Sequence, residues 1–314
     1  MKTIIKKAGM FYMALSFGLT SCETFDFGQE MGQKVICIIS DDDLVFTGMH
    51  DLNEPESTGY ISVNCGGSLH IDRDVEVCME YSPEVLAQYN KSKYDIDEEK
   101  YAKELDSRYY TIPEMRVTLK ASSADTYDTM PIRVRPEGLS PDSIYFIPLR
   151  IRSVSAYSVN PDKSQVLYRV YMKNLYARSD EASIYNATGT TQKDGENEVE
   201  AAASQTFHPL TKNTFRIFAG IKGYETDADV IRKNGIIVQV NEDHSLTMRP
   251  YDEDSIEVAP VDASRPDYYG EYSLSEVYGG KKRQRFDFKY KYRFRVIRNG
   301  RPLICVPCAV LRST

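Results

Sequence analysis

Polar and apolar residues alternate strictly over residues 285–296, and this is the clearest pattern in the 314-residue chain. A period of two predicts a strand with one buried and one solvated face. The apolar face carries Phe286, Phe288, Tyr290, Tyr292, Phe294 and Val296. Asn299 and Gly300 follow, a pair that favours a tight turn between antiparallel strands. Residues 303–311 supply an apolar return strand, so residues 285–311 predict a β-hairpin.

The same periodicity recurs earlier in the chain. Residues 69–80 and 166–172 alternate in this way, and residues 144–151 form a more continuous apolar run around Pro148. Such a run predicts a strand buried on both faces, with the proline at a bulge or an edge. Further short strands are predicted at residues 35–39, 115–119, 132–134, 215–218 and 236–240. The pattern therefore indicates a mainly β protein.

Helical signals are confined to one region. Ser82 precedes Pro83, and proline at the first helical position after a capping residue is typical of a helix start. This predicts a short helix over residues 83–89, and residues 97–105 form a second helical candidate.

Residues 188–204 are polar, acidic and poor in branched apolar residues, which predicts a loop or linker. We place the domain boundary slightly earlier, because Ile184 and Tyr185 suit the first strand of a second domain. This divides the chain into residues 1–21, 22–178 and 179–314, with the acidic linker or loop inside residues 179–206.

The first 21 residues have the parts of an export signal. Lys2, Lys6 and Lys7 precede an apolar run over residues 8–19, which is shorter than the roughly 20 residues of a transmembrane helix. The sequence Leu-Thr-Ser-Cys at residues 19–22 resembles the lipobox of bacterial lipoproteins. The resemblance implies cleavage before Cys22 and lipidation of Cys22, which would attach the protein to outer-membrane lipid. An ordinary secretory signal with an unrelated cysteine is the alternative.

Charge narrows the classes of partner. Removing residues 1–21 removes three lysines and no acidic residue, so the net charge changes from −7 to −10. Nucleic acids and anionic membrane surfaces need clustered positive charge, so neither is an expected partner.

The cysteines do not predict a complete disulfide framework. Five follow Cys22, at positions 37, 65, 78, 305 and 308, and an odd number cannot pair fully within one chain. Cys305 and Cys308 have the spacing of a redox or metal site, but no second pair or histidine lies nearby. They also lie in an apolar run and not at a helix start, which favours structural strand cysteines over a redox pair.

No motif for catalysis or for metal binding emerges. The four histidines stand apart from one another, and no nucleophile elbow, phosphate-binding loop or zinc-protease motif occurs. The acidic runs at residues 41–43 and 252–254 have the oxygen ligands that calcium prefers, although such runs are usually solvated loops. We therefore predict no catalytic residue, no metal and no cofactor. Two carboxylates converging across strands for glycoside hydrolysis stay an open alternative.

Short motifs in both halves resemble the two-domain lipoproteins of unknown function at the surface of Bacteroidetes, which are associated with polysaccharide-utilisation loci. The motifs lie at residues 86–90, 109–113, 145–151 and 166–174, then at 207–210, 213–216, 288–294 and 310–312. The resemblance implies an immunoglobulin-like β-sandwich followed by an antiparallel β-barrel-like or β-sandwich domain. It also implies a surface protein that binds a glycan or polysaccharide beside other surface uptake proteins, with no catalytic motif.

The loop over residues 265–272 is the sequence-based candidate for glycan contact. Aromatic rings stack on sugars, and carboxylates accept hydrogen bonds from hydroxyl groups, although the chain contains 23 tyrosines and no tryptophan. The candidate contacts are Tyr268, Tyr269, Tyr272, Asp267 and Glu271. In the alternative view these tyrosines cover the end of the second domain's barrel.

These observations leave a glycan-binding accessory protein as the first hypothesis. A structural or adhesive protein that acts through protein–protein contacts, such as a fimbria-like subunit, is the alternative. An open aromatic platform would favour the first hypothesis, and a long unpaired edge strand would favour the second.

Overall fold

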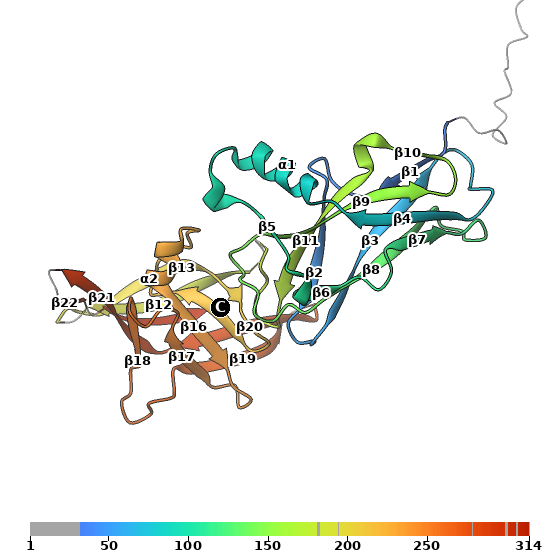
Figure 1. Cartoon of the computed structure of the whole chain (residues 1–314). Helices are drawn as coiled ribbons and strands as arrows, with labels where there is room; N and C mark the ends of the chain where they lie inside the picture. The colour runs from blue at the N-terminus through green and yellow to red at the C-terminus, as the bar shows by residue number, and fades with distance from the viewer. Residues whose placement is uncertain are drawn as a thin grey trace, which may run out of the picture.

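The structure is a computed structural model of the chain, and it describes residues 32–180, 183–193, 195–277, 279–298, 301–305 and 307–313. Side chains are described as far as residue 295. Two β domains lie end to end, with the N-terminal half of the chain in one and the C-terminal half in the other (Figure 1). The expected mainly β, two-domain fold is confirmed.

The N-terminal domain is a sandwich of two sheets. The five-stranded sheet has the order β10 (Ser158–Val159), β1 (Val35–Ile38), β3 (Ser57–Gly66), β8 (Tyr127–Val134) and β6 (Tyr110–Thr111). The six-stranded sheet has the order β2 (Val45–Asp51), β11 (Gln165–Lys173), β9 (Tyr145–Val154), β4 (Val75–Tyr81) and β7 (Arg116–Leu119), with β5 (Lys103–Glu104) beside β9. Alternate residues of both sheets fill one apolar core, as the period of two predicts.

Two polar residues, His50 and Tyr168, are hydrogen-bonded to each other inside this core. The Tyr168 hydroxyl lies 2.9 Å from His50 Nε2, and His50 Nδ1 lies 3.2 Å from the carbonyl oxygen of Ser57. Because a carbonyl only accepts, Nδ1 carries the proton and Nε2 accepts from Tyr168. A Cβ at Gly48 or Gly59 would lie 1.8 Å from the Tyr168 hydroxyl oxygen, so these two glycines make room for the tyrosine. Burial lowers the pKa of His50 to about 4.

Helix α1 (Pro83–Tyr94) covers the outer face of the six-stranded sheet (Figure 1). Val85 and Leu86 pack against Phe146 and Leu167 of the sheet. The helix is longer than the sequence predicts, whereas the second helical candidate is one turn, η1 (Glu98–Lys100), before β5. Within the described part of the chain, no helix is long and apolar enough to cross a membrane.

The C-terminal domain is built from a large sheet and a small one. The large sheet contains β13 (Val199–Thr206), β12 (Ile184–Lys193), β23 (Pro307–Ser313), β20 (Lys281–Phe288) and β19 (Gly270–Val277), with β18 (Ile256–Pro260), β21 (Tyr290–Arg298) and β22 (Arg301–Cys305) on a branch. The small sheet contains β14 (His208–Pro209), β15 (Thr214–Phe218), β16 (Gly235–Val240) and β17 (Leu246–Pro250), and α2 (Ala228–Asn234) precedes β16. A bridge between Ser245 and Glu271 joins the two sheets into a barrel-like body.

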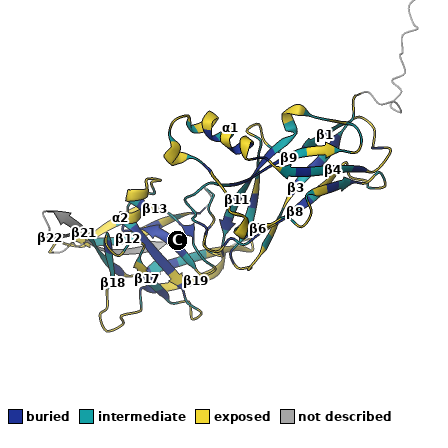
Figure 2. Ribbon diagram, viewed as in Figure 1, coloured by how far each residue is buried: buried dark blue, intermediate teal, exposed yellow. Residues whose placement is uncertain are grey.

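Stacked aromatic rings form the centre of the second core. The ring centroids of Phe207 and Phe215 lie 4.4 Å apart, and Phe286 meets both rings edge-on at 5.2 Å. Phe288 and Tyr290 are also buried, so the apolar face predicted for residues 285–296 is confirmed for these positions. Figure 2 shows buried strand segments inside both domains.

Two expectations about individual elements are corrected. The single strand expected over residues 285–296 is divided at Lys289. On one edge β20 pairs with β19 and β21 pairs with β18, whereas on the other edge β23 pairs with both. Alternation identifies the buried face but not the partner strand, so it does not show this change of partner. The return hairpin itself is confirmed, with Arg298 opposite Arg301 in β21 and β22.

The loop expected over residues 188–204 is mostly a β-hairpin. β12 and β13 pair antiparallel from Ile184 with Thr206 to Thr191 with Val199, and only the turn between the two strands is acidic loop. These strands are half exposed and carry Ala, Gly and Thr, so the apolar alternation that marks a strand is weak. The boundary at residue 178 lies between β11, the last strand of the N-terminal sandwich, and β12.

Candidate functional site

A buried ion pair joins the two domains. Asp142 lies between β8 and β9 of the sandwich, and Arg216 lies on β15 of the second domain. Two guanidinium nitrogens of Arg216 donate to the two carboxylate oxygens of Asp142, at 2.5 and 2.6 Å. The Arg216 side chain is 0% exposed and that of Asp142 is 18% exposed, so the N-terminal domain covers this polar face of β15. Such bidentate pairs fix geometry as well as charge.

Further contacts surround the ion pair. The Asn174 amide, at the end of β11, donates to the carbonyl oxygens of Thr211 and Thr214 at 2.7 and 2.9 Å. The guanidinium of Arg216 lies over the ring of Tyr251, 5.2 Å from its centroid. Tyr224 donates to Asp142 over a long 3.4 Å. These contacts fix the position of the second domain against the end of the sandwich.

A groove of about 880 Å³ runs along this junction. Its lining comes from both domains and from the connection between them, and consists of Pro141, Arg169, Tyr171, Ser179, Asp180, Ile184, Thr206, His208 and Tyr224. This volume lies within the range of small-molecule sites, roughly 300–1,000 Å³.

Strand periodicity places Arg169 and Tyr171 in the groove. Tyr168, Val170 and Met172 point into the sandwich core, so the residues between them point outward. The Arg169 guanidinium lies over the Tyr171 ring, 4.4 Å from its centroid. One wall of the groove is therefore a cation stacked on an aromatic ring.

His208 and Tyr224 line the groove from the second domain. Their ring centroids lie 4.2 Å apart, and His208 is only 7% exposed. Burial, followed by the nearby charge of Arg216, lowers the pKa of His208 to about 4, so the ring is neutral at neutral pH. Neither ring nitrogen hydrogen-bonds to another residue that the structure describes, and Nε2 is fully buried. An aromatic and neutral polar surface of this kind suits a ligand with both apolar faces and hydroxyl groups.

The sequence-based candidate loop has a different geometry. Tyr269 and Tyr272 are 8% and 5% exposed and belong to the core of the second domain, as the alternative view expects. Tyr268 is half-buried, donates to Glu271 at 2.7 Å, and has the Arg265 guanidinium 3.4 Å from its ring centroid. Asp267 and Glu271 are exposed. A glycan contact at this loop stays a prediction, and only Tyr268 among its three rings is accessible for it.

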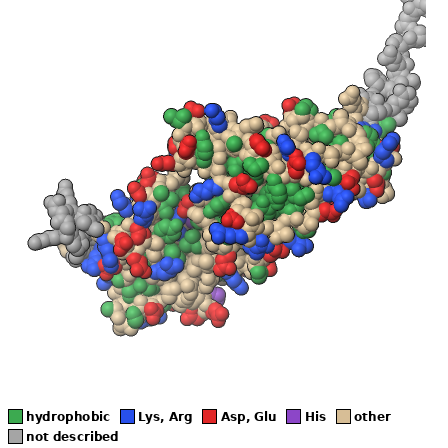
Figure 3. Space-filling view, in the orientation of Figure 1, with side chains coloured by type: hydrophobic (Ala, Val, Ile, Leu, Met, Phe, Trp, Pro, Cys, Tyr) green, Lys and Arg blue, Asp and Glu red, His purple; other side chains and the backbone are tan. Residues whose placement is uncertain are grey.

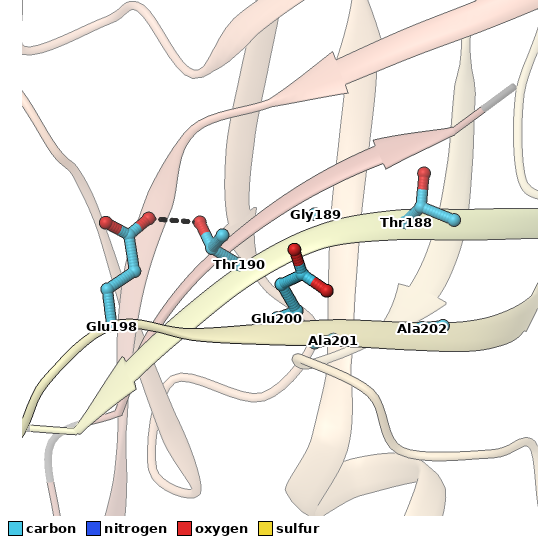
Figure 4. Close-up of a pocket in the computed structure, with 7 residues that line it drawn as sticks. All are labelled: Thr188, Gly189, Thr190, Glu198, Glu200, Ala201 and Ala202. Carbon is cyan, nitrogen blue, oxygen red and sulfur yellow. Dashed lines mark hydrogen bonds between the residues drawn. The ribbon is translucent and has the colours of Figure 1, made fainter.

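A second hollow of about 770 Å³ lies on the β12–β13 hairpin. It is lined by Thr188, Gly189, Thr190, Glu198, Glu200, Ala201 and Ala202. Figure 4 shows Thr188, Thr190 and Glu200 on one side of the hairpin, with Thr190 hydrogen-bonded to Glu198. No aromatic residue occurs among these lining residues, so this hollow offers no stacking surface for a sugar.

The acidic runs at residues 41–43 and 252–254 stabilise turns through hydrogen bonds and an ion pair. Asp41 accepts from the backbone of Val45 at 2.7 Å, and Asp43 pairs with Lys93 at 3.1 Å. Asp252 accepts from the backbone of Asp254 and from the Ser255 hydroxyl. Within the described part of the chain, no group of three or more potential ligands could hold a metal ion.

Cysteine chemistry and surface charge add no second candidate. Cys37 and Cys78 are free thiols. Cys22 and the side chains of Cys305 and Cys308 lie outside the described part of the chain. On the visible face of both domains, basic and acidic side chains are interspersed (Figure 3).

Sequence reasoning missed the groove because its walls come from both domains. Arg169 and Tyr171 lie on the polar face of a correctly predicted strand, and that position was the only available signal. His208 and Tyr224 lie within weakly patterned segments of the second domain. Nothing in the sequence shows that these residues face β11.

A pair of family models matches the chain. A model of an N-terminal domain covers residues 33–158, and a model of a C-terminal domain covers residues 164–302. No curated protein matches the sequence.

Solved structures from Bacteroides share the fold. A multidomain protein including DUF1735 from Bacteroides ovatus is 18% identical, with a TM-score of 0.65, and the match covers 89% of this chain and 94% of that one. A B. ovatus protein of unknown function is 18% identical, with a TM-score of 0.62 and coverage of 88% and 94%. An auxiliary nutrient binding protein from Bacteroides thetaiotaomicron is 15% identical, with a TM-score of 0.61 and coverage of 86% and 90%. With both domains matched in order, the chain belongs to a family of two-domain Bacteroidetes proteins.

Proposed function

We propose that this protein is a non-catalytic, lipid-anchored surface protein that binds a glycan in the groove between its two domains. The observation that carries the proposal is the composition of the groove, which places Tyr171 and Tyr224 beside the neutral His208 and several hydroxyl groups. Sugar rings have apolar faces that stack on aromatic rings, and hydroxyl groups that bond to polar side chains. The nutrient-binding description of one neighbour with this fold agrees with such a role.

A groove between domains also suits a binding protein physically. The ion pair between Asp142 and Arg216 holds the walls in place before a ligand arrives. A preformed site binds more tightly, because less conformational entropy is lost on association.

The test is a comparison of two tryptophan variants at exposed apolar positions. Ile184 is 60% exposed and lines the groove, whereas Leu274 is 49% exposed on β19 and is not among the groove residues. In affinity gels containing a panel of plant and host polysaccharides, we expect Ile184→Trp to lose the retardation that the wild-type protein shows. Leu274→Trp should behave as the wild type. Equal retardation of all three proteins would exclude the groove as the binding site.

The membrane anchor is a separate part of the proposal. Cys22 lies outside the described residues, so the proposal of a lipid anchor is based on the lipobox-like sequence at residues 19–22. In cells fed labelled palmitate, the wild-type protein should carry label and fractionate with the outer membrane. Cys22→Ala should carry none and should leave the membrane fraction. A labelled, membrane-bound Cys22→Ala protein would contradict the anchor.

One observation favours an adhesive role as a second candidate. β13 spans eight residues, from Val199 to Thr206, and pairs only with β12 among the described strands. An edge strand of this length, without lysine or proline, can pair with a strand of another chain. If the protein assembles in this way, sedimentation should show concentration-dependent association that Ala202→Lys abolishes. A wild-type protein that stays monomeric at high concentration would remove this candidate.

A further inference from the structure

Among the described residues that line the groove, one positive charge has no acidic partner that the structure describes. Arg169 and Asp180 are the charged residues among the described lining, since His208 is neutral. Asp180 already accepts from the Arg178 guanidinium at 2.5 Å. Arg169 forms no ion pair with any residue that the structure describes, whereas the nearby Arg216 is neutralised by Asp142.

The position of Arg169 leaves its donors available. The guanidinium is stacked over Tyr171, and it hydrogen-bonds to no other residue in the described part of the chain. A guanidinium presents five N–H donors around its edge, and stacking on an aromatic face leaves that edge free. The planar fork matches the two oxygens of a carboxylate or a sulfate.

A neutral ligand would leave this charge poorly compensated. A ligand that fills the groove takes the Arg169 guanidinium out of water, and burying an unpaired charge is costly. An anionic group on the ligand removes that cost and adds charge-assisted hydrogen bonds. The rest of the lining is aromatic, aliphatic or hydroxylic, and the groove is much larger than a single small anion.

We therefore propose that the groove takes a glycan with an anionic sugar residue, and that Arg169 is the specificity-determining residue that receives the anionic group. This inference rests on the proposed glycan-binding function and adds the class of sugar. The anionic group is the carboxylate of a uronic acid or a sulfate ester, and each can present a pair of oxygens to the fork of the guanidinium.

The test uses three oligosaccharide probes of equal length with the mature protein. Galacturonate oligosaccharides carry carboxylates, sulfated galactan oligosaccharides carry sulfates, and galactan oligosaccharides are neutral. We expect one anionic probe to bind the wild-type protein at least about tenfold more tightly than the neutral probe, and more weakly as salt increases. The anionic probe that binds shows whether the anionic group is a carboxylate or a sulfate.

Two substitutions assign the effect to Arg169. Arg169→Met keeps a long side chain on Tyr171 and removes the charge, so it should lose about tenfold or more in affinity for the anionic probe alone. Arg169→Lys should recover part of that loss, because it restores the charge without the planar fork. Arg249→Met, an exposed arginine on β17 that does not line the groove, is the matched control and should bind as the wild type.

The outcomes separate this inference from the proposed function. If Ile184→Trp abolishes binding while Arg169→Met has no effect, the groove binds glycan but the anionic specificity is wrong. If neither variant affects binding, both proposals are wrong. Preference of the wild-type protein for the neutral probe, or no binding of either anionic probe at millimolar concentration, overturns the anionic specificity.

Discussion

The two buried histidines are sensitive points at the scale of single residues. His50 lies in the core of the sandwich and His208 lies at the domain junction, and burial lowers the pKa of each to about 4. In the unfolded chain a histidine titrates near its ordinary pKa of 6.5. Between these two values, therefore, the unfolded state binds more protons than the folded state.

The free energy of unfolding should consequently fall as the pH drops from about 6.5 to about 4. Each histidine accounts for up to roughly 3 kcal/mol of this fall in the free energy of unfolding, because one unit of pKa difference corresponds to about 1.4 kcal/mol. Melting temperatures measured across this range should decrease, and the slope should be smaller in the double variant His50→Gln and His208→Gln. An identical slope in the double variant would show that carboxylates alone cause the acid sensitivity.

Tyr272 tests whether the candidate loop serves binding or packing. Its hydroxyl is buried and has no hydrogen-bond partner among the described residues. Removing an unsatisfied buried hydroxyl relieves a desolvation cost, so Tyr272→Phe should raise the free energy of unfolding by about 1 kcal/mol. Tyr272→Ala should lower it by about 3–5 kcal/mol, because a large cavity remains.

Chemical denaturation of both Tyr272 variants measures these changes. Tyr268→Ala serves as a comparison at an accessible ring and should change stability by less than about 1 kcal/mol. Destabilisation by Tyr272→Phe would indicate that the hydroxyl has a partner in solution.

At the scale of elements, the sequence predicted the buried face of a strand better than it predicted which strands pair with each other. Residues 166–172 and 285–296 carry a strong apolar alternation, and the predicted faces are correct for residues 166–172 and for residues 286–294. The β12–β13 hairpin lacks that signal, because β13 lies at the edge of the sheet and both strands are half exposed. Strand pairing depends on which segments meet in space, and so the division at Lys289 and the junction groove were not predictable.

The hairpin also determines where the chain should be cut first. The connection between β11 and β12 is held by hydrogen bonds, since Ser179 donates to the Met172 carbonyl and the Arg178 backbone donates to the Ser183 hydroxyl. The turn after β12 is exposed and follows Lys193. Brief trypsin treatment should therefore cut after Lys193, within the expected boundary region of residues 178–204.

The two tryptic fragments should remain associated, because β12 and β13 stay paired along their length. Denaturing gels would show two fragments, and native size-exclusion chromatography would show one species of unchanged size. Early cuts at several points inside either domain would contradict the proposed division of the chain.

At the scale of the whole molecule, the ion pair between Asp142 and Arg216 should control how the domains are held together. Asp142→Ala leaves the fully buried Arg216 without a partner, and breaking a buried pair in this way costs about 3–5 kcal/mol. Replacing both residues, with Asp142→Leu and Arg216→Met, removes the unpaired charge and should restore much of the loss. Calorimetry of the single and double variants measures both effects.

Loss of the ion pair should also loosen the arrangement of the two domains. Small-angle scattering should show a wider distribution of interdomain distances in Asp142→Ala than in the wild-type protein. A single variant that is as stable as the wild type, with unchanged scattering, would show that the pair does not hold the junction.

The most direct test of the central claim is a crystal structure of the protein with a bound oligosaccharide, chosen from the polysaccharides that retard it in affinity gels. We expect the sugar to lie in the junction groove and to contact Tyr171, His208 and Tyr224, with any anionic group on Arg169. A sugar bound instead at Tyr268 or on the β12–β13 hairpin, with the groove empty, would show that the groove is not the binding site.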